Sequence, residues 1–122
     1  MILVIGGAYQ GKEEYVYRTL LQESGGQSRE KSSEYIVINH YHLKVKEQLQ
    51  EGLEPLKEAQ KLLTDAGDKT LVVICDEVGY GVVPVDAFER AWREKVGRVC
   101  CCFAQKADQV IRVVCGVGNR IK

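Results

Sequence analysis

The stretch that decides the fold is Met1-Ile-Leu-Val-Ile-Gly-Gly-Ala-Tyr-Gln-Gly-Lys12, at the start of the chain. Its apolar run, from Ile2 to Ile5, is typical of a strand buried on both faces of a parallel sheet. The residues from Gly6 to Lys12 match the G-x-x-x-x-G-K pattern of a phosphate-binding loop between a strand and a helix. The glycines of such a loop let backbone N–H groups surround a polyphosphate, while Lys12 reaches the β- and γ-phosphate oxygens.

Glu13 stands where this pattern has Ser or Thr, whose hydroxyl holds Mg²⁺. A carboxylate can itself ligate Mg²⁺. It also brings negative charge near a phosphate, at a cost of about 4 kcal/mol per charge pair for an effective dielectric near 20. Two interpretations of the loop stay open: weak or altered binding of a nucleotide, and a glycine-rich turn that binds nothing.

The remainder of the chain alternates between helical and extended patterns. Helices are predicted over 12–23, over 49–67 and over 85–104, and strands over 35–38, 70–75 and 109–115; 25–33 is predicted to be a mobile loop. Pro55 leaves two alternatives for the middle region: a kinked helix, or one helix that ends near Gly52 and another with Pro55 in its first turn. This order predicts an α/β fold with a mainly parallel sheet of about four or five strands.

The composition fits one globular domain over residues 1–122. Lys and Arg number 17 and Asp and Glu number 17, and this zero net charge argues against a dedicated nucleic-acid or anionic-membrane binder. The sequence has neither an apolar run of the roughly 18–20 residues that span a membrane nor a signal peptide, so we expect a cytoplasmic protein. The five cysteines include no C-x-x-C pair, and adjacent ones on a helix point about 100° apart, so we expect buried free thiols.

A second chemically distinctive loop, Asp76 to Pro84, follows the predicted strand over 70–75. Paired acids at the end of a buried strand commonly handle a metal ion or an attacking hydroxyl, which makes Asp76 and Glu77 candidates. The alternative is that one carboxylate caps a turn and the other is solvated. His40 and His42 would point in alternate directions if the strand over 35–38 continued, so we expect hydrogen-bonded or surface histidines rather than a pair.

The string Glu77-Val-Gly-Tyr-Gly-Val-Val-Pro84 resembles the adenosylcobinamide kinase / adenosylcobinamide-phosphate guanylyltransferase family. The resemblance continues through Gly97-Arg-Val99 and Ala107-Asp108 to Ile121-Lys122, and it includes the opening strand and phosphate loop. It covers about half of the chain, at both ends.

This resemblance implies a P-loop NTPase-like three-layer fold, a homo-oligomer, and phosphorylation of a corrinoid, adenosylcobinamide, with GTP or ATP and Mg²⁺. Carried over residue by residue, Gly6, Gly7, Gly11 and Lys12 would cradle the triphosphate, and Glu77 and Gly79 would lie in the loop that faces the nucleotide and the acceptor. Beyond that resemblance, we expect Ala8 and Glu13 at the nucleotide and Lys12 and Glu77 as the catalytic residues. Glu13 or Glu77 is the expected Mg²⁺ contact.

The sequence departs from the family pattern at Glu13 and at Cys100-Cys101, which replace a Ser and an Asn-Gln pair. The family's chains are also longer in the middle, where the histidine that accepts the guanylyl group lies, and neither His40 nor His42 falls in that motif. We therefore expect a purine-nucleotide-binding kinase of cobalamin biosynthesis that lacks the guanylyltransferase step. The alternative is a non-catalytic nucleotide-binding or partner protein that kept the fold.

Overall fold

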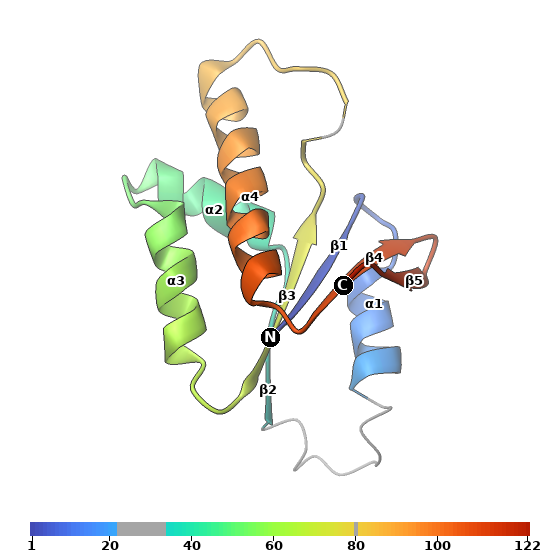
Figure 1. Ribbon diagram of the computed structural model, residues 1–122. Coiled ribbons are helices and arrows are strands. Elements are labelled where there is room, and N and C mark those ends of the chain that lie inside the picture. The colour runs from blue at the N-terminus through green and yellow to red at the C-terminus, as the bar shows by residue number, and fades with distance from the viewer. Residues whose placement is uncertain (22–33, 80) are drawn as a thin grey trace.

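The computed structural model describes residues 1–21, 34–79 and 81–122. The strands are β1 (Ile2–Gly6), β2 (Tyr35–Ile38), β3 (Thr70–Asp76), β4 (Gln109–Val114) and β5 (Val117–Arg120). The helical segments are α1 (Lys12–Tyr15), the π-helix η1 (Val16–Leu20), α2 (Tyr41–Gln50), α3 (Pro55–Asp65) and α4 (Ala87–Lys106) (Figure 1). The predicted loop over 25–33 and the predicted end of the first helix, Glu23, lie outside the described residues.

The strands form one sheet in the order β2-β3-β1-β4-β5. β1 pairs in parallel with β3 and β4, and β2 pairs in parallel with β3. β5 runs antiparallel to β4 after a turn at Cys115 and Gly116, both of which have positive φ. The prediction of an α/β fold with a mainly parallel sheet is confirmed. The polar sequence of β5, Val117-Gly-Asn-Arg120, carries no apolar run that would predict a strand.

Helices cover both faces of the sheet, which gives three layers. Because side chains alternate along a strand, Leu3 of β1 packs in one apolar cluster and Val4 in the other. The first cluster includes Phe103 of α4 and Tyr41 of α2, and the second includes Val16 of η1. Figure 1 accordingly shows α2, α3 and α4 on one side of the sheet and α1 on the other.

The two crossovers that begin at β1 and β3 leave the sheet in opposite directions. β1 continues through α1 to β2, whereas β3 continues through α4 to β4 on the far side of β1. In open α/β sheets the crevice at the carboxyl ends of two such strands is the usual ligand site. Here the N–H of Glu77 donates to the carbonyl oxygen of Gly6 (2.9 Å), so the ends of β1 and β3 are held together.

The helix boundaries decide one open alternative and correct one prediction. Pro55 begins α3 and Gly52, with φ of 76°, follows α2, so the two-helix alternative is right and the kinked helix is wrong. The predicted first helix is α-helical only through Tyr15 and continues as η1, whose backbone bonds include Leu21 N–H to the Val16 carbonyl. The long helix, α4, begins at Ala87, after Asp86 accepts hydrogen bonds from two backbone N–H groups of its first turn.

All five cysteines are free thiols, but their exposure differs. Cys75 is buried, whereas Cys101 and Cys115 are exposed, so the expectation of uniformly buried thiols is wrong. For Cys101 the reason is helical geometry: successive residues of α4 turn by about 100°, and only some can face the sheet. Cys115 lies in the turn between β4 and β5. Among the described residues, no helix combines the length and the apolar character needed to cross a membrane.

Candidate functional site

The loop between β1 and α1 has a shape fixed by the backbone around it. A Cβ atom at Gly6 would collide with a backbone carbonyl of β4, and Gly11 caps α1 with φ of 84°. Gly6 therefore requires glycine for the fold itself, and the backbone conformation at Gly11 favours it. Gln10 holds the middle of the loop: its carbonyl oxygen accepts from the Gly116 N–H and its Oε1 accepts from the Cys115 N–H, each at 2.8 Å.

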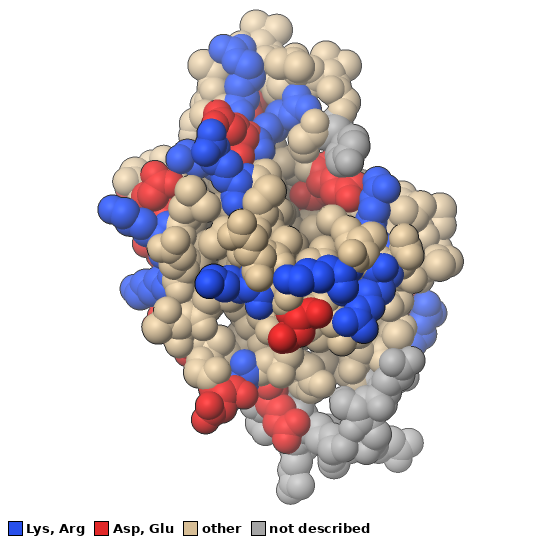
Figure 2. All heavy atoms as spheres, viewed as in Figure 1, with Lys and Arg blue, Asp and Glu red and all other residues tan. Residues whose placement is uncertain are grey.

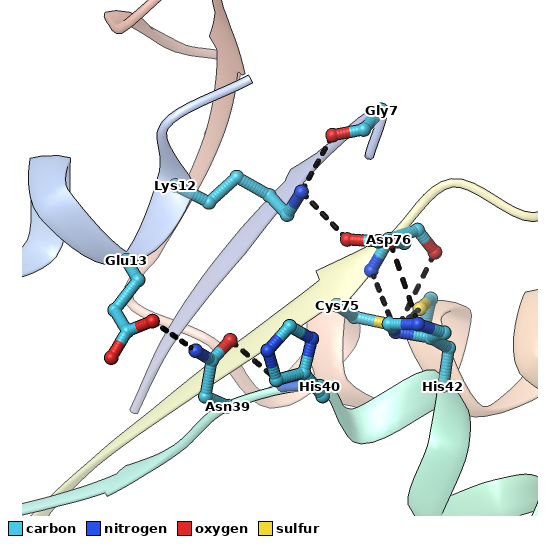
Figure 3. A network of polar contacts seen from close by, with 9 residues as sticks. Gly7, Lys12, Glu13, Asn39, His40, His42, Cys75 and Asp76 are labelled. Atoms are coloured by element: carbon cyan, nitrogen blue, oxygen red, sulfur yellow. Dashed lines mark hydrogen bonds and ion pairs between the residues drawn. The ribbon is translucent and has the colours of Figure 1, made fainter. Parts of the chain in front are cut away.

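Lys12 reaches from the start of α1 into the crevice between β1 and β3. Its Nζ lies 2.6 Å from the carbonyl oxygen of Gly7, to which it donates, and 2.6 Å from Oδ1 of Asp76 (Figure 3). The lysine side chain is 7% exposed, and an ammonium with so little water needs partners of this kind. Lys12 therefore joins the loop to the last residue of β3.

Asp76 is held on two sides, because His42 contacts both its backbone and its carboxylate. His42 Nδ1 accepts a hydrogen bond from the Asp76 N–H (3.3 Å), and His42 Nε2 lies 3.4 Å from Oδ2. Burial lowers the pKa of His42 below its ordinary value of 6.5, and this effect exceeds the opposite one of the Asp76 charge. With Nδ1 as acceptor, the proton of the neutral ring is assigned to Nε2, which donates toward Oδ2.

His42 is itself fixed from α4. The indole Nε1 of Trp92 donates to the His42 carbonyl oxygen (2.7 Å), and the two rings lie 6.3 Å apart. Lys46 lies above the same indole, 4.6 Å from its centre, and pairs with Glu89 at 3.0 Å. These contacts anchor the first turn of α2 to α4. They also fix the His42 ring, which in turn orients the Asp76 carboxylate.

Glu13 contacts the end of β2. Its Oε2 accepts a hydrogen bond from Asn39 Nδ2 (2.8 Å), and Asn39 Oδ1 accepts from the His40 N–H (2.8 Å) (Figure 3). The side chain of Glu13 is exposed. Glu13 therefore bridges α1 and the β2–α2 junction at the rim of the crevice.

One cavity of about 320 Å³ collects these groups, a volume within the usual range for a small-molecule site. It is lined by residues 8–13, Asn39, His40, His42, Leu43 and Asp76. On the face of the molecule in Figure 2, basic and acidic side chains are interspersed. Because charges of both signs are mixed there and the formal net charge is zero, attraction for a phosphate must come from local groups such as Lys12.

Glu77 and Gly79 line a neighbouring cavity of about 230 Å³, which Asp76 also lines. Both carboxylate oxygens of Glu77 accept hydrogen bonds from Arg112 of β4, at 2.9 and 3.1 Å, and its side chain is 13% exposed. The structure thus gathers Lys12, Glu13 and Asp76 in one cavity. It places Glu77 apart, paired with a cation, and its assignment to Mg²⁺ stays a prediction.

Two features of the site have no counterpart in the sequence-based expectations. The first is the contact between the two histidines. β2 ends at Ile38 and α2 begins at Tyr41, so the assumption of a continued strand is wrong. As a result, the rings of His40 and His42 lie edge to face, 5.8 Å apart. The second is the pairing of Glu77 with Arg112, a residue that the sequence did not single out as a candidate. A signal for His42 existed, since it closely follows a strand whose carboxyl end lies at the same edge as Asp76.

The cavity of about 320 Å³ offers ligands that fit Mg²⁺ carried by a nucleotide rather than a metal bound by protein alone. Within residues 1–21, 34–79 and 81–122, the structure contains no cluster of three or more His, Cys, Asp or Glu side chains that could hold a metal ion. Mg²⁺ usually takes only one or two protein carboxylates and completes its shell with water and substrate phosphates. Asp76 and Glu13 could supply that number.

Comparison with known proteins gives one family. The model of the family described as cobinamide kinase / cobinamide phosphate guanyltransferase matches residues 27–121. The bifunctional adenosylcobalamin biosynthesis protein CobU of Salmonella typhimurium (strain LT2) is 42% identical over 52 residues, which are 43% of this chain and 29% of that protein. The protein of the same description from Escherichia coli (strain K12) is 40% identical over 52 residues, with the same two shares. The matched segment thus spans less than a third of either relative.

Proposed function

Because the chain belongs to the cobinamide kinase / cobinamide phosphate guanyltransferase family, we propose that it acts in cobalamin biosynthesis by phosphorylating a cobinamide-type alcohol. The phosphate donor in this proposal is a purine nucleoside triphosphate, GTP or ATP, bound in the cavity of the loop over 6–12. The observation that carries the proposal is the contact of Lys12 with both Gly7 and Asp76 at the crevice between β1 and β3. The family match itself begins after the loop, so nucleotide binding is argued from this geometry.

In this proposal, triphosphate binding exchanges a partner of Lys12. Its Nζ donates to the Gly7 carbonyl and contacts Asp76, which leaves one of its three N–H groups; phosphate oxygens take that group and replace the carboxylate. The carboxylate then loses its cation in a site where an unpaired charge is costly. Asp76 and Glu13 are the residues that would hold a Mg²⁺ ion bound with the nucleotide, and such an ion would neutralise charge on the carboxylate and on the phosphoryl oxygens.

The two oxygens of Asp76 have separate roles in this scheme. His42 faces Oδ2 and Trp92 holds His42, so that oxygen stays oriented when the Lys12 contact opens. Oδ1 is the oxygen released by Lys12 and becomes available to the ligand. Positioning of this kind is the main contribution a protein makes to phosphoryl transfer.

The neighbouring cavity suits the acceptor alcohol. Asp76 lines both cavities, so a hydroxyl placed in the second can reach the same carboxylate. The apolar part of that cavity is formed by Ile5, Val78 and Val96. Arg93 shapes its rim by donating to the carbonyl oxygens of Gly79 and Val82, each at 2.7 Å.

The test follows the γ-phosphate directly. Labelled GTP and ATP are incubated with Mg²⁺, cobinamide and either the wild-type chain, Lys12→Met or the control Lys57→Ala, which removes the same charge from the exposed surface of α3. We expect labelled cobinamide phosphate from the wild type and the control, and a loss of about 10²–10³-fold in Lys12→Met. Absence of transfer from wild-type protein with both nucleotides contradicts the proposal.

A further inference from the structure

Two cysteine thiols contact each other beside the second cavity. Cys75 lies in β3 and is 1% exposed, while Cys100 lies in α4, which packs on that face of the sheet. Their sulfur atoms are 3.6 Å apart, although 25 positions separate the two residues in the sequence. A contact between thiols from two packed elements is set by the fold and does not depend on a mobile loop.

The two thiols differ in access. Cys100 is half-buried and lines the cavity of about 230 Å³ together with Glu77 and Gly97. Cys75 is closed off by the sheet and the helices. Since oxidation of a thiol follows its accessibility, a small oxidant in this cavity meets Cys100 first.

We propose that Cys75 and Cys100 form an oxidation site at which hydrogen peroxide converts the two thiols into a reversible disulfide. In the first step the Cys100 sulfur attacks the O–O bond; an S–O bond forms, the O–O bond breaks, and one water leaves with the thiol proton. In the second step the Cys75 sulfur attacks the Cys100 sulfur, the S–S bond forms, and the S–O oxygen leaves as a second water. Two thiols are oxidised by two electrons, and one peroxide is reduced to two waters.

The geometry selects this pair over the neighbouring cysteines. The sulfur atoms of Cys75 and Cys100 must approach from 3.6 Å to a bonded distance of about 2.05 Å, and in this proposal a rotation of the Cys100 side chain supplies that approach. Cys101 and Cys102 follow Cys100 on the same helix and point about 100° and 200° away from it. Cys101 is exposed and accordingly faces away from Cys75.

The experiment maps disulfides after mild treatment with hydrogen peroxide. Trypsin separates Cys75, in the peptide 70–90, from Cys100, in the peptide 99–106, but the second peptide also contains Cys101 and Cys102. The wild type is therefore compared with C101S/C102S, in which a link between the two peptides identifies the pair. We expect both chains to lose two hydrogen atoms in mass, to yield the linked peptides, and to return to the reduced mass with dithiothreitol.

Two single variants separate the steps. In Cys75→Ser, Cys100 should stop at the sulfenic acid and react with a 1,3-diketone probe, whereas in Cys100→Ser the buried Cys75 should stay reduced. The proposal is overturned if peroxide oxidises Cys101 or Cys115 while Cys75 and Cys100 remain thiols. It is equally overturned if C101S/C102S yields no linked peptide.

Discussion

The pairing of Lys12 with Asp76 should make a large contribution to the stability of the ligand-free protein. The two charged atoms are 2.6 Å apart, and the side chains are only 7% and 18% exposed. At an effective dielectric near 20, such a pair attracts by about 6 kcal/mol, and desolvation offsets much of that gain. Removing one partner leaves the other charge poorly solvated, which for buried pairs costs about 3–5 kcal/mol. We expect the lower end, because Gly7 still binds Lys12 and His42 still contacts Asp76.

A double-mutant cycle measures this pairing. Urea unfolding, followed by circular dichroism without nucleotide, is compared for wild type, Lys12→Met, Asp76→Asn and the double variant. Each single variant should lose about 3 kcal/mol in free energy of unfolding, and the double variant should lose clearly less than the sum, with a coupling of about 2 kcal/mol.

The matched control is the pair Arg98–Glu94, whose side chains are 61% and 62% exposed and also lie within ion-pair distance, at 2.8 Å. The same cycle on Arg98→Met and Glu94→Gln should give a coupling below about 0.5 kcal/mol. A coupling that small at Lys12 and Asp76 would refute the reasoning, because the two charges would then not depend on each other.

Three further outcomes follow from the contacts. The folded-state pKa of His42 is lowered below 6.5, so its contribution to stability is present above 6.5 and is lost as the pH falls from 6.5 through the lowered folded-state pKa; unfolding midpoints from pH 8 to 5 should show this slope, and His42→Gln should remove it. Gly6→Ala forces a new Cβ against a β4 carbonyl and should lower the free energy of unfolding by about 2–3 kcal/mol. In Gly97→Ala the new Cβ meets no atom within 4 Å, so the substitution should stabilise α4 by up to about 1 kcal/mol. Equal effects of the two substitutions in thermal unfolding would contradict this account of the packing. Glu77→Gln weakens the bond to Arg112, which is 45% exposed, so a loss near 1 kcal/mol is expected, and a loss above about 3 kcal/mol in urea unfolding would show that the pair behaves as buried.

Local sequence patterns predict most of the fold. The apolar runs of β1 and β3 predict buried strands because a covered parallel sheet needs apolar side chains on both faces. The loop from Gly6 to Lys12 follows from a motif whose residues are adjacent in sequence. Pro55 marked a helix boundary because it has no N–H to donate, although the sequence left open whether a kink or a new helix results.

The contacts that build the site depend on distances across the fold, which local patterns do not contain. His42 meets Asp76 only because β2 ends at Ile38 and α2 turns back toward β3. The bond of Glu77 to Arg112 joins residues 35 positions apart, one directly after β3 and the other in β4, which the sequence does not show to lie so close. The π-helix η1 was also not predicted, because no residue pattern in the sequence indicates a π-helix there.

The measurement that tests the central claim most directly is calorimetric titration of the wild-type chain, Lys12→Met and Lys57→Ala with GTP and ATP in the presence of Mg²⁺. Wild type and Lys57→Ala should bind at least one nucleotide with equal affinity. Lys12→Met, which loses the cation aimed into the crevice, should bind about 100-fold more weakly, a difference of about 2.7 kcal/mol. Unchanged affinity in Lys12→Met, or no binding heat with either nucleotide in the wild type, would contradict the assignment of the loop over 6–12 as a nucleotide site.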